Sequence, residues 1–560
     1  MFRETQDLQM TLNDRYFTAG KQAKTAVEKS RAWLVGEVIY PNVDESKFAA
    51  LFSDNKGSRP NIPIRVYFCA LVLKRLYGLS DEVLIELIRC GALEFLYALH
   101  TTDADSQPLS LVSLSRFRRK IAEYDEANGC DLVKEEYNRI SGIIRKAMPL
   151  LPKSISDKEE EADADRSLLA RMDSMMIEAH AKVMPRVEIL YTTIQLMLRL
   201  LIREGLRKII PATMKHYLDD DDKNSSLYFK GDAKKRADLQ LQTTARLLAD
   251  MDQLSKIVKD SEDLKDTPTY KVFFRVLDEQ SFVDDKGVRH ARDKKDIAPD
   301  SVQNPYDATE TYRNKRGPHH GYVLHVEETI DGNGNGILTS ADYQPNNVSD
   351  SAMAKNQLAS MPDDGQKRTE IADGAYSGDE ISKLAEEKNV NLFTTNLTGK
   401  LPDESMADFE ISEDGKSVLK CPKGHAPYSS TWDEKHKRYK VAFSKSHCAN
   451  CPFAPYCKGH DLKRKPLTIV YISPKTIARA RTVRFLGTNV AKAMACKRNG
   501  IEGVMSVLRR KYRLDEIPVF GIIRSSLWVW TSLLSYNIVK FQKYLQSLTP
   551  DEYEKVLMAL

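Results

Sequence analysis

The chain has 560 residues, of which 42 % are hydrophobic, and this is enough for roughly two to four domains with buried cores. Its 84 Lys and Arg against 79 Asp and Glu leave a net charge of +5, so the total charge identifies no class of partner. The longest uncharged apolar stretch near the C-terminus, Ser525 to Val539, has 15 residues. That is fewer than the roughly 20 needed to cross a bilayer, so the stretch predicts a buried helix and argues against a membrane protein.

The first residues, MFRETQDLQM, contain no apolar core, and we expect neither an export signal nor a location outside the cytoplasm. Eight cysteines in such a chain favour a reducing compartment, where clustered thiols bind metal. Cys69, Cys90, Cys130 and Cys496 are scattered, and we expect them to be buried packing residues.

Short amphipathic helices are predicted from Asn61 to about Leu150, one of them capped by Ser80. In SLSRFRRKI, the spacing of Leu114, Phe117 and Ile121 places them on one helix face. This turns three arginines outward, namely Arg116, Arg118 and Arg119. Two interpretations stay open: a DNA-binding helical domain over residues 1–150, or a basic face that contacts only solvent. The acidic residues 151–168 then read as a linker.

A second domain is expected to begin at residue 169, with a short strand around Asp173 and a first part that extends to residue 405. A buried carboxylate in the middle of a strand is costly without a partner. Two long helical patterns follow, and they predict a helical insertion at about 185–265.

Alternating apolar residues from Tyr322, interrupted by glycines at 332–336, predict a β-hairpin. A helix at about 351–360, a strand ending at Asp373, a turn at Gly374, a helix near Asp379 and the strand VNLFTT complete the order. Strands and helices in this order describe an α/β fold with a mixed sheet.

Glu502 is the single acidic residue among the 40 positions from Pro474 to Arg513, which include eleven Lys and Arg. Two Asp on strands and one Glu on a helix are the set that a two-metal phosphoryl-transfer site requires, because Mg²⁺ prefers hard oxygen ligands. Around Glu502, the cations predicted to bind DNA phosphate are Arg498, Arg509, Arg510 and Lys511. The alternative is that Glu502 simply pairs with Arg498 on a surface helix.

Four stretches in this order, RMDSMMIEA, HHGYVLHVEETIDGNG, TEIADGAYSGDE and CKRNGIEGVMSVLRRKY, resemble the DDE transposases of bacterial and archaeal insertion sequences. The segment from DNKGSRPNIPIRVYF to SRFRRKI is similar to the helical N-terminal domain of the InsH-type group. The family often carries a Y-x2-R-x3-E-x6-K helix; here Arg498 and Arg509 fit its basic positions, and Ala495 replaces the Tyr.

The resemblance implies a ribonuclease H-like catalytic domain with the triad Asp173, Asp373 and Glu502 and two Mg²⁺ or Mn²⁺ ions. It implies cleavage at the transposon end, followed by attack of the released 3′-hydroxyl on target DNA. It also implies a homodimer in the DNA complex and a nucleoid-associated location. Two alternatives stay open: a transposase-derived DNA-binding protein that has lost catalysis, and a metal-dependent nuclease of the same fold.

Four cysteines follow a C-x26-C-x2-C-x5-C pattern, which is suited to a structural zinc ion: Cys421, Cys448, Cys451 and Cys457. His425, His447 or His460 can replace a thiolate, and unmetallated cysteines are the alternative. We expect a zinc-ribbon-like insertion over residues 406–465, followed by the second part of the catalytic domain, residues 466–545, with the Glu502 helix.

Overall fold

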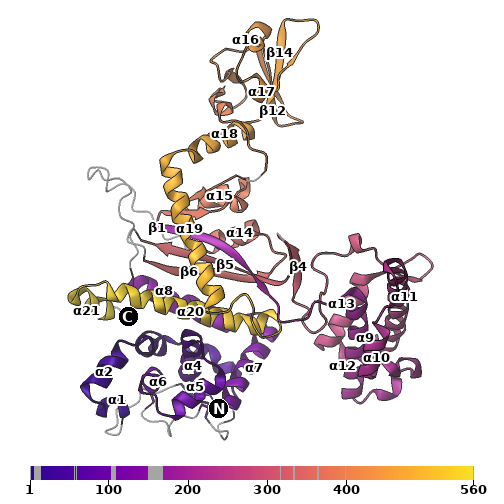
Figure 1. Ribbon diagram of the computed structural model, residues 1–560, viewed down its shortest axis with the longest axis vertical. Helices are drawn as coiled ribbons and strands as arrows, with labels where there is room; N and C mark the ends of the chain where they lie inside the picture. Colours follow the sequence, from indigo (N-terminus) through magenta and orange to yellow (C-terminus); the bar gives the residue numbers. More distant parts are fainter. Residues whose placement is uncertain are drawn as a thin grey trace.

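The computed structural model describes residues 2–4, 14–53, 55, 57, 60–101, 109–148, 168–315, 317–331, 335–361, 365–397, 399–558 and 560. Almost all of the expected acidic linker lies outside these residues. A mixed β-sheet occupies the middle of the molecule, and helical or β-rich parts surround it (Figure 1).

The N-terminal part is helical, as predicted. Ser80 caps α5 by accepting a hydrogen bond from the backbone N–H of Val83, and Ser110 forms a capping box at the start of α7. The main helices are α1 (Arg15–Thr18), α2 (Lys21–Glu28), α3 (Arg31–Leu34), α4 (Ile64–Tyr77), α5 (Asp81–Arg89), α6 (Leu93–Ala98), α7 (Leu111–Asn128) and α8 (Leu132–Ala147).

The central sheet is mixed, also as predicted. Its strands are β1 (Leu168–Glu178), β4 (Thr311–Asn314), β5 (Pro318–Ile330), β6 (Gly336–Pro345), β7 (Arg368–Ala372) and β8 (Val390–Thr394). Their order is β4-β5-β1-β7-β8, with β6 also paired to β5. β1 runs antiparallel to β5 and parallel to β7. The predicted hairpin is β5 and β6, and its turn at 332–334 lies outside the described residues.

The alternation of side chains along β1 separates the two faces of the sheet. Met172 packs into a core with α14 (Asp350–Ser360) and α15 (Asp379–Glu387) on one face. Leu169 packs against Ile371 and Met494 on the other face, where α19 (Asn489–Arg510) crosses the sheet. Asp173 therefore belongs to the face that α19 covers.

A helical part between β1 and β4 has a core of its own. Its helices are α9 (Arg186–Arg203), α10 (Asp220–Ser226), α11 (Ala233–Val258), α12 (Glu262–Lys265) and α13 (Pro268–Gln280), followed by the short strands β2 (Ser281–Val283) and β3 (Arg289–Ala291). Both predicted long helices are present, as α9 and α11, and the helices continue to Gln280. This part projects to the right in Figure 1, away from α19.

The cysteine-containing segment forms a separate small β-unit at the top of Figure 1. It contains β9 (Glu410–Ile411), β10 (Val418–Lys420), β11 (Ser429–Asp433), β12 (Arg438–Ser444), α16 (Lys445–Ala449), α17 (Ala454–Cys457), β13 (His460–Asp461) and β14 (Leu467–Ile472). The order of its four-stranded sheet is β11-β12-β14-β13. We call residues 410–472 the cysteine unit, and α18 (Pro474–Leu486) joins it to α19.

The predicted buried apolar helix is α20 (Ile522–Gln546), which is followed by α21 (Pro550–Met558). α20 lies between the N-terminal helices and the sheet, and it packs on α4, α8 and β6. Its buried Asn537 bonds both the N–H and the C=O of Leu338 on β6, at 2.9 Å each. The N-terminal helices and the sheet therefore share one continuous core. In the described ranges, no helix combines the length and the apolar character needed to span a membrane.

Candidate active site and cysteine cluster

Two strand carboxylates lie side by side at the centre of the sheet. β1 and β7 are parallel, with Leu168 opposite Arg368 and Arg171 opposite Ile371. Two residues further along, the same register brings Asp373, directly after β7, beside Asp173. Neighbouring parallel strands therefore bring together two aspartates that the sequence placed on separate strands.

Gly374 allows the chain to turn close to the loop that follows β8. A Cβ atom at this position would lie 2.6 Å from the side-chain oxygen of Asn396 and 2.7 Å from its carbonyl oxygen. The sequence predicted a sharp turn here, and the requirement for glycine comes from this close approach. Asp373 caps the short helix Gly374–Tyr376 by accepting a 2.7 Å hydrogen bond from the N–H of Ala375.

The third predicted carboxylate lies on α19 and is connected to Asp173 through Arg498. The Nη2 of Arg498 lies 2.5 Å from the Oδ2 of Asp173, and its Nη1 lies 3.0 Å from the Oε1 of Glu502. Arg498 and Asp173 are largely buried, with side chains 14 % and 16 % exposed, whereas the Glu502 side chain is 59 % exposed. One guanidinium thus bridges a strand carboxylate and a helix carboxylate. The predicted surface pair of Glu502 with Arg498 exists, but Asp173 takes part in it.

The electrostatics of Asp173 reflect this crowding of acidic groups. Burial raises the pKa of Asp173 above its ordinary value, and the charges of Glu502 and Asp373 raise it further, while Arg498 opposes both effects. Asp173, Asp373 and Glu502 are thus close enough for their charges to interact, and a positive charge between them stabilises the ionised carboxylates.

Sequence reasoning missed a group of residues that holds α19 against the sheet. Arg171, on the same face of β1 as Asp173, donates from Nη1 to the carbonyl of Lys497 on α19 at 2.6 Å. Its Nη2 also binds the buried Glu328 of β5 at 2.6 Å. A Cβ atom on Gly500 would lie 1.8 Å from that Nη1, so only glycine leaves room for Arg171. The available signal was an arginine two residues before Asp173, on a strand, and a glycine two residues before Glu502, on a helix.

The other basic residues predicted near Glu502 lie at the C-terminal end of α19. Arg509 and Arg510 are exposed there. The ammonium of Lys511 lies 5.0 Å from the ring of Tyr512, and burial together with the charges of Arg31 and Lys543 lowers its pKa. Arg498, by contrast, belongs to the carboxylate cluster.

The three arginines predicted on α7 differ in their contacts. Arg116 and Arg119 are exposed, and Arg119 lies 3.6 Å from Glu123 one turn away. Arg118 instead forms two hydrogen bonds with Asp81, at 3.1 and 2.5 Å. Burial raises the pKa of Asp81, but the bonds from Arg118 and Lys74 outweigh this effect and lower it to about 2. Arg118 therefore joins α7 to α5.

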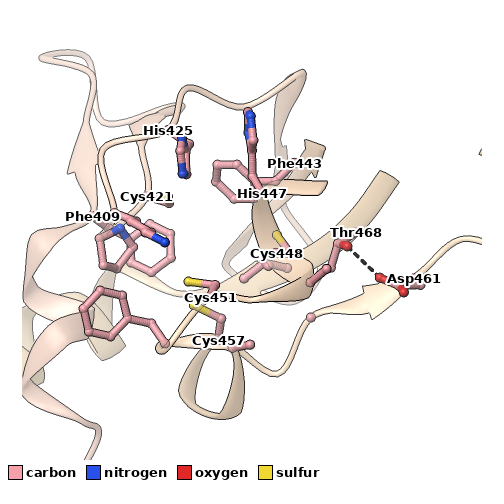
Figure 2. Close-up of a pocket in the computed structure, with 17 residues that line it drawn as sticks. Phe409, Cys421, His425, Phe443, His447, Cys448, Cys451, Cys457, Asp461 and Thr468 are labelled. Carbon is pink, nitrogen blue, oxygen red and sulfur yellow. Dashed lines mark hydrogen bonds between the residues drawn. The ribbon is translucent and has the colours of Figure 1, made fainter. Parts of the chain in front are cut away.

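All four clustered cysteines line one cavity of about 420 Å³ in the cysteine unit. Figure 2 shows Cys448, Cys451 and Cys457 around this cavity, with the rings of His425 and His447 across from them. The two rings are stacked, with centroids 4.1 Å apart. His460 lies elsewhere, against the ring of Tyr471. The structure thus brings together the residues that the spacing predicted, with two of the three histidines.

Burial raises the pKa of the Cys457 thiol to about 12, and the neighbouring Cys451, Cys421 and Cys448 thiols add to the rise. Thiols this close together remain protonated unless a cation offsets their charge. Within the part of the chain that the structure describes, no three His, Cys, Asp or Glu side chains already converge closely enough to hold a metal ion. This is true of the cysteine cavity and of Asp173, Asp373 and Glu502 alike.

The scattered cysteines only partly match the expectation of burial. Cys69 is buried in α4 and Cys130 is half-buried, but Cys90 and Cys496 are exposed. Cys90 follows the last turn of α5, and Cys496 lies on α19 outside the buried positions of that helix. An apolar sequence context did not determine which side of the helix faced solvent.

Comparisons with known protein families found two matches. Residues 420–542 match a family described as "Transposase DDE domain", and residues 23–120 match one described as "Transposase domain (DUF772)". The first match includes the cysteine cluster, Arg498 and Glu502, and the second ends within α7, after Arg116, Arg118 and Arg119. Neither a search of curated proteins nor a search of solved structures found a match.

Proposed function

We propose, from the matches to two transposase domain families, that this chain is a DDE transposase and that Asp173, Asp373 and Glu502 form its catalytic triad. The reaction is metal-dependent cleavage at the transposon end, followed by transfer of the released 3′-hydroxyl to target DNA. The bridge from Asp173 through Arg498 to Glu502 is the observation that carries this proposal. It links a strand carboxylate with the acidic residue of a helix that is otherwise basic.

The donor set fits Mg²⁺ or Mn²⁺, because all three side chains offer hard carboxylate oxygens. Burial raises the pKa of Asp173 and the charges of Glu502 and Asp373 raise it further, so a bound cation would stabilise the ionised carboxylate. Two bound divalent ions would activate the attacking oxygen and stabilise the leaving one. Arg498 now holds two of the three carboxylates, so the side chains must rearrange when metal binds.

The residues of the chain position the DNA. Arg498, Arg509, Arg510 and Lys511 bind phosphates along α19, and Arg171 with Gly500 holds that helix at the correct distance from β1. The strand order β6-β5-β1-β7-β8, in which β5 is antiparallel to its neighbour β1, supports a ribonuclease H-like catalytic domain. In that domain the helical part from α9 to α13 and the cysteine unit are insertions.

A zinc ion is the proposed occupant of the cysteine cavity. Cys421, Cys448, Cys451 and Cys457 offer four thiolates, which is the donor set of a closed structural site. The core of the cysteine unit is small, with 11 buried residues, and a metal would stabilise the unit further. Metal analysis of the purified protein should find about one zinc per chain, and Cys451→Ser or Cys457→Ser should lower that content. Cys90→Ser, at an exposed position, is the control, and equal losses in all three variants would contradict the assignment.

DNA is the proposed partner of the N-terminal helices as well. Arg116 and Arg119 are exposed and available for phosphate contacts, whereas a contact by Arg118 would break its bonds to Asp81. Since transposition joins two ends of one element, a homodimer is proposed in the DNA complex.

Cleavage and joining of DNA that carries the ends of the element, with Mg²⁺ or Mn²⁺, tests the proposal. Asp173→Ala, Asp373→Ala and Glu502→Ala should each abolish both steps while DNA binding persists. Glu554→Ala, an exposed carboxylate on α21, is the control and should cleave normally. If the three triad variants still cut, the triad is wrong. If the wild type cuts without joining, the protein is a nuclease, and if it binds without cutting, it is a DNA-binding derivative.

A further inference from the structure

The basic charge of the chain is concentrated in one continuous segment that extends well beyond the Glu502 helix. From Lys435 to Arg513 the sequence contains 20 Lys and Arg but only two acidic residues, Asp461 and Glu502. Glu502 belongs to the candidate active site. Asp461 is bound by Lys445 at 3.0 Å and by the hydroxyl of Thr468 at 2.6 Å. The segment thus contains almost no acidic charge of its own, and three of its cations pair with carboxylates outside it: Lys437 with Glu434, Arg438 with Asp433 and Arg484 with Asp408.

Nine of these cations lie in the cysteine unit, and three of them are consecutive. Lys463, Arg464 and Lys465 occupy the exposed loop that connects β13 to β14. Among the residues that the structure describes, these three side chains form no ion pair. Three adjacent like charges repel one another, so a polyanion that binds all three relieves a cost present in the free protein.

The sheet beside this loop adds further cations to the same unit. Tyr439, Val441 and Phe443 of β12 point into the small core, so Arg438 and Lys440 point outward by strand alternation. Lys440 lies opposite Tyr471 of β14, and the guanidinium of Arg438 lies 4.2 Å from the centroid of that tyrosine ring. His460 stacks near the same ring, with centroids 5.6 Å apart. The outer face of the sheet thus presents Lys440, His460 and Arg438 around an aromatic ring, and Arg438 also lies 3.5 Å from Asp433.

The cysteine unit is connected to the active site by helices of the same charge. α18 contributes Lys475 and Arg481, and α19 contributes Lys492 and Lys497, before the chain reaches Arg498. In Figure 1 the cysteine unit lies at the far end of α18, away from the N-terminal helices and beyond the central sheet. A duplex that lies along α19 at the carboxylates can therefore continue toward the cysteine unit without meeting an acidic surface on this segment.

We propose that the cysteine unit is a second DNA-binding arm, which contacts duplex phosphates through Lys463, Arg464 and Lys465 and through the outer face of its sheet. This inference depends on the proposed function in one respect, namely that the ligand of the basic segment is DNA. Phosphate contacts of this kind position DNA without reading its sequence. The arm therefore binds the DNA that flanks the scissile phosphate, whatever its base sequence.

The test is the affinity of the full-length protein for duplex DNA, measured by fluorescence anisotropy over a range of NaCl concentrations without divalent cations. The combined variant Lys463→Ala, Arg464→Ala, Lys465→Ala should bind at least about tenfold more weakly at low salt. The slope of log affinity against log salt should decrease by about two to three, because each lost phosphate contact contributes about 0.9.

The matched control removes the same charge elsewhere. Lys234, Lys235 and Arg236 are also consecutive and exposed, at the start of α11 in the helical part that projects away from α19. Lys234→Ala, Lys235→Ala, Arg236→Ala should change the affinity less than about twofold. If both combined variants lose the same DNA affinity, only the net charge of the protein matters and the arm is wrong. If the loop variant binds DNA as tightly as the wild type, the arm is also wrong.

Two further measurements separate this proposal from that of the catalytic triad. Unchanged thermal unfolding and metal content of the loop variant would show that the cysteine unit is still folded. At saturating protein the loop variant should cleave at the wild-type rate, since it retains the triad. If the loop variant binds DNA normally but no longer cleaves it, the proposed arm is wrong. If the wild-type protein does not cleave but its DNA binding still depends on the loop, only the catalytic triad is wrong.

Discussion

Arg498 and Asp173 are 325 residues apart in the sequence, yet the Nη2 of Arg498 lies 2.5 Å from the Oδ2 of Asp173. The same guanidinium contacts Glu502 one helical turn away, at 3.0 Å. A fixed cation therefore lies between two carboxylates that are proposed to bind metal. Before DNA binds, Arg498 therefore competes with the metal for these two carboxylates. Once DNA is bound, we expect Arg498 to bind a phosphate instead.

The first prediction concerns metal affinity without DNA. Arg498→Ala should bind Mn²⁺ roughly three- to tenfold more tightly than the wild type, because losing the competing ion pair is worth about 1 kcal/mol. Electron paramagnetic resonance of free Mn²⁺ during a titration measures this directly. Arg509→Ala, on the same helix, should leave the Mn²⁺ affinity unchanged. Weaker Mn²⁺ binding by Arg498→Ala would show that the arginine organises the carboxylates instead of competing for them.

Gly500 and Gly503 form a matched pair on α19. A Cβ atom at Gly500 would lie 1.8 Å from the Nη1 of Arg171, whereas one at Gly503 would have nothing within 4 Å. Gly500→Ala should displace α19 or Arg171 and lower the cleavage rate by about a hundredfold, since displacements of about 1 Å are this costly. Gly503→Ala should cleave like the wild type and stabilise the helix by up to about 1 kcal/mol. Single-turnover cleavage and thermal unfolding of both variants check this, and equal cleavage rates would contradict the positioning role of Arg171.

The shared core predicts that α20 couples the N-terminal helices to the sheet. Asn537→Ala would leave the buried N–H and C=O of Leu338 without partners, at a cost of about 2 to 4 kcal/mol in the free energy of unfolding. Denaturant unfolding should show the N-terminal part and the sheet destabilised together. Gln546→Ala, exposed on the same helix, is the control and should change little. Destabilisation of the sheet alone would mean that the two parts unfold independently.

His325 predicts a pH dependence of stability. It is fully buried on β5, neither ring nitrogen has a hydrogen-bond partner among the described residues, and burial lowers its pKa to about 4. The unfolded chain binds this proton below about pH 6.5, but the folded chain does so only below about pH 4. The free energy of unfolding therefore falls as the pH drops through that window.

His325→Leu removes this contribution. Between about pH 7 and pH 5, the wild type should lose about 2 kcal/mol more of its free energy of unfolding than the variant loses. Urea unfolding at the two pH values measures the difference. If the free energy of unfolding falls equally in the wild type and the variant, groups other than His325 cause the pH dependence.

Much of the molecule followed from local patterns in the sequence. Apolar periodicity predicted the N-terminal helices, α9, α11 and the β5–β6 hairpin, because the period of a pattern reports which face of an element is buried. The resemblance to DDE transposases pointed to Asp173, Asp373 and Glu502, and spacing pointed to the four cysteines, because metal chemistry restricts the residue types that can serve. The basic segment around Glu502 could also be identified from the amino-acid sequence alone.

Only the tertiary structure decided the partners. It placed Arg498 against Asp173, used Arg118 to bind Asp81, required glycine at position 500 for Arg171, and exposed Cys90 and Cys496. Each of these contacts joins residues on different elements, and each exposure depends on what packs against the helix. A side chain's type and local period determine what it can bind, whereas long-range packing determines which of the available groups it meets.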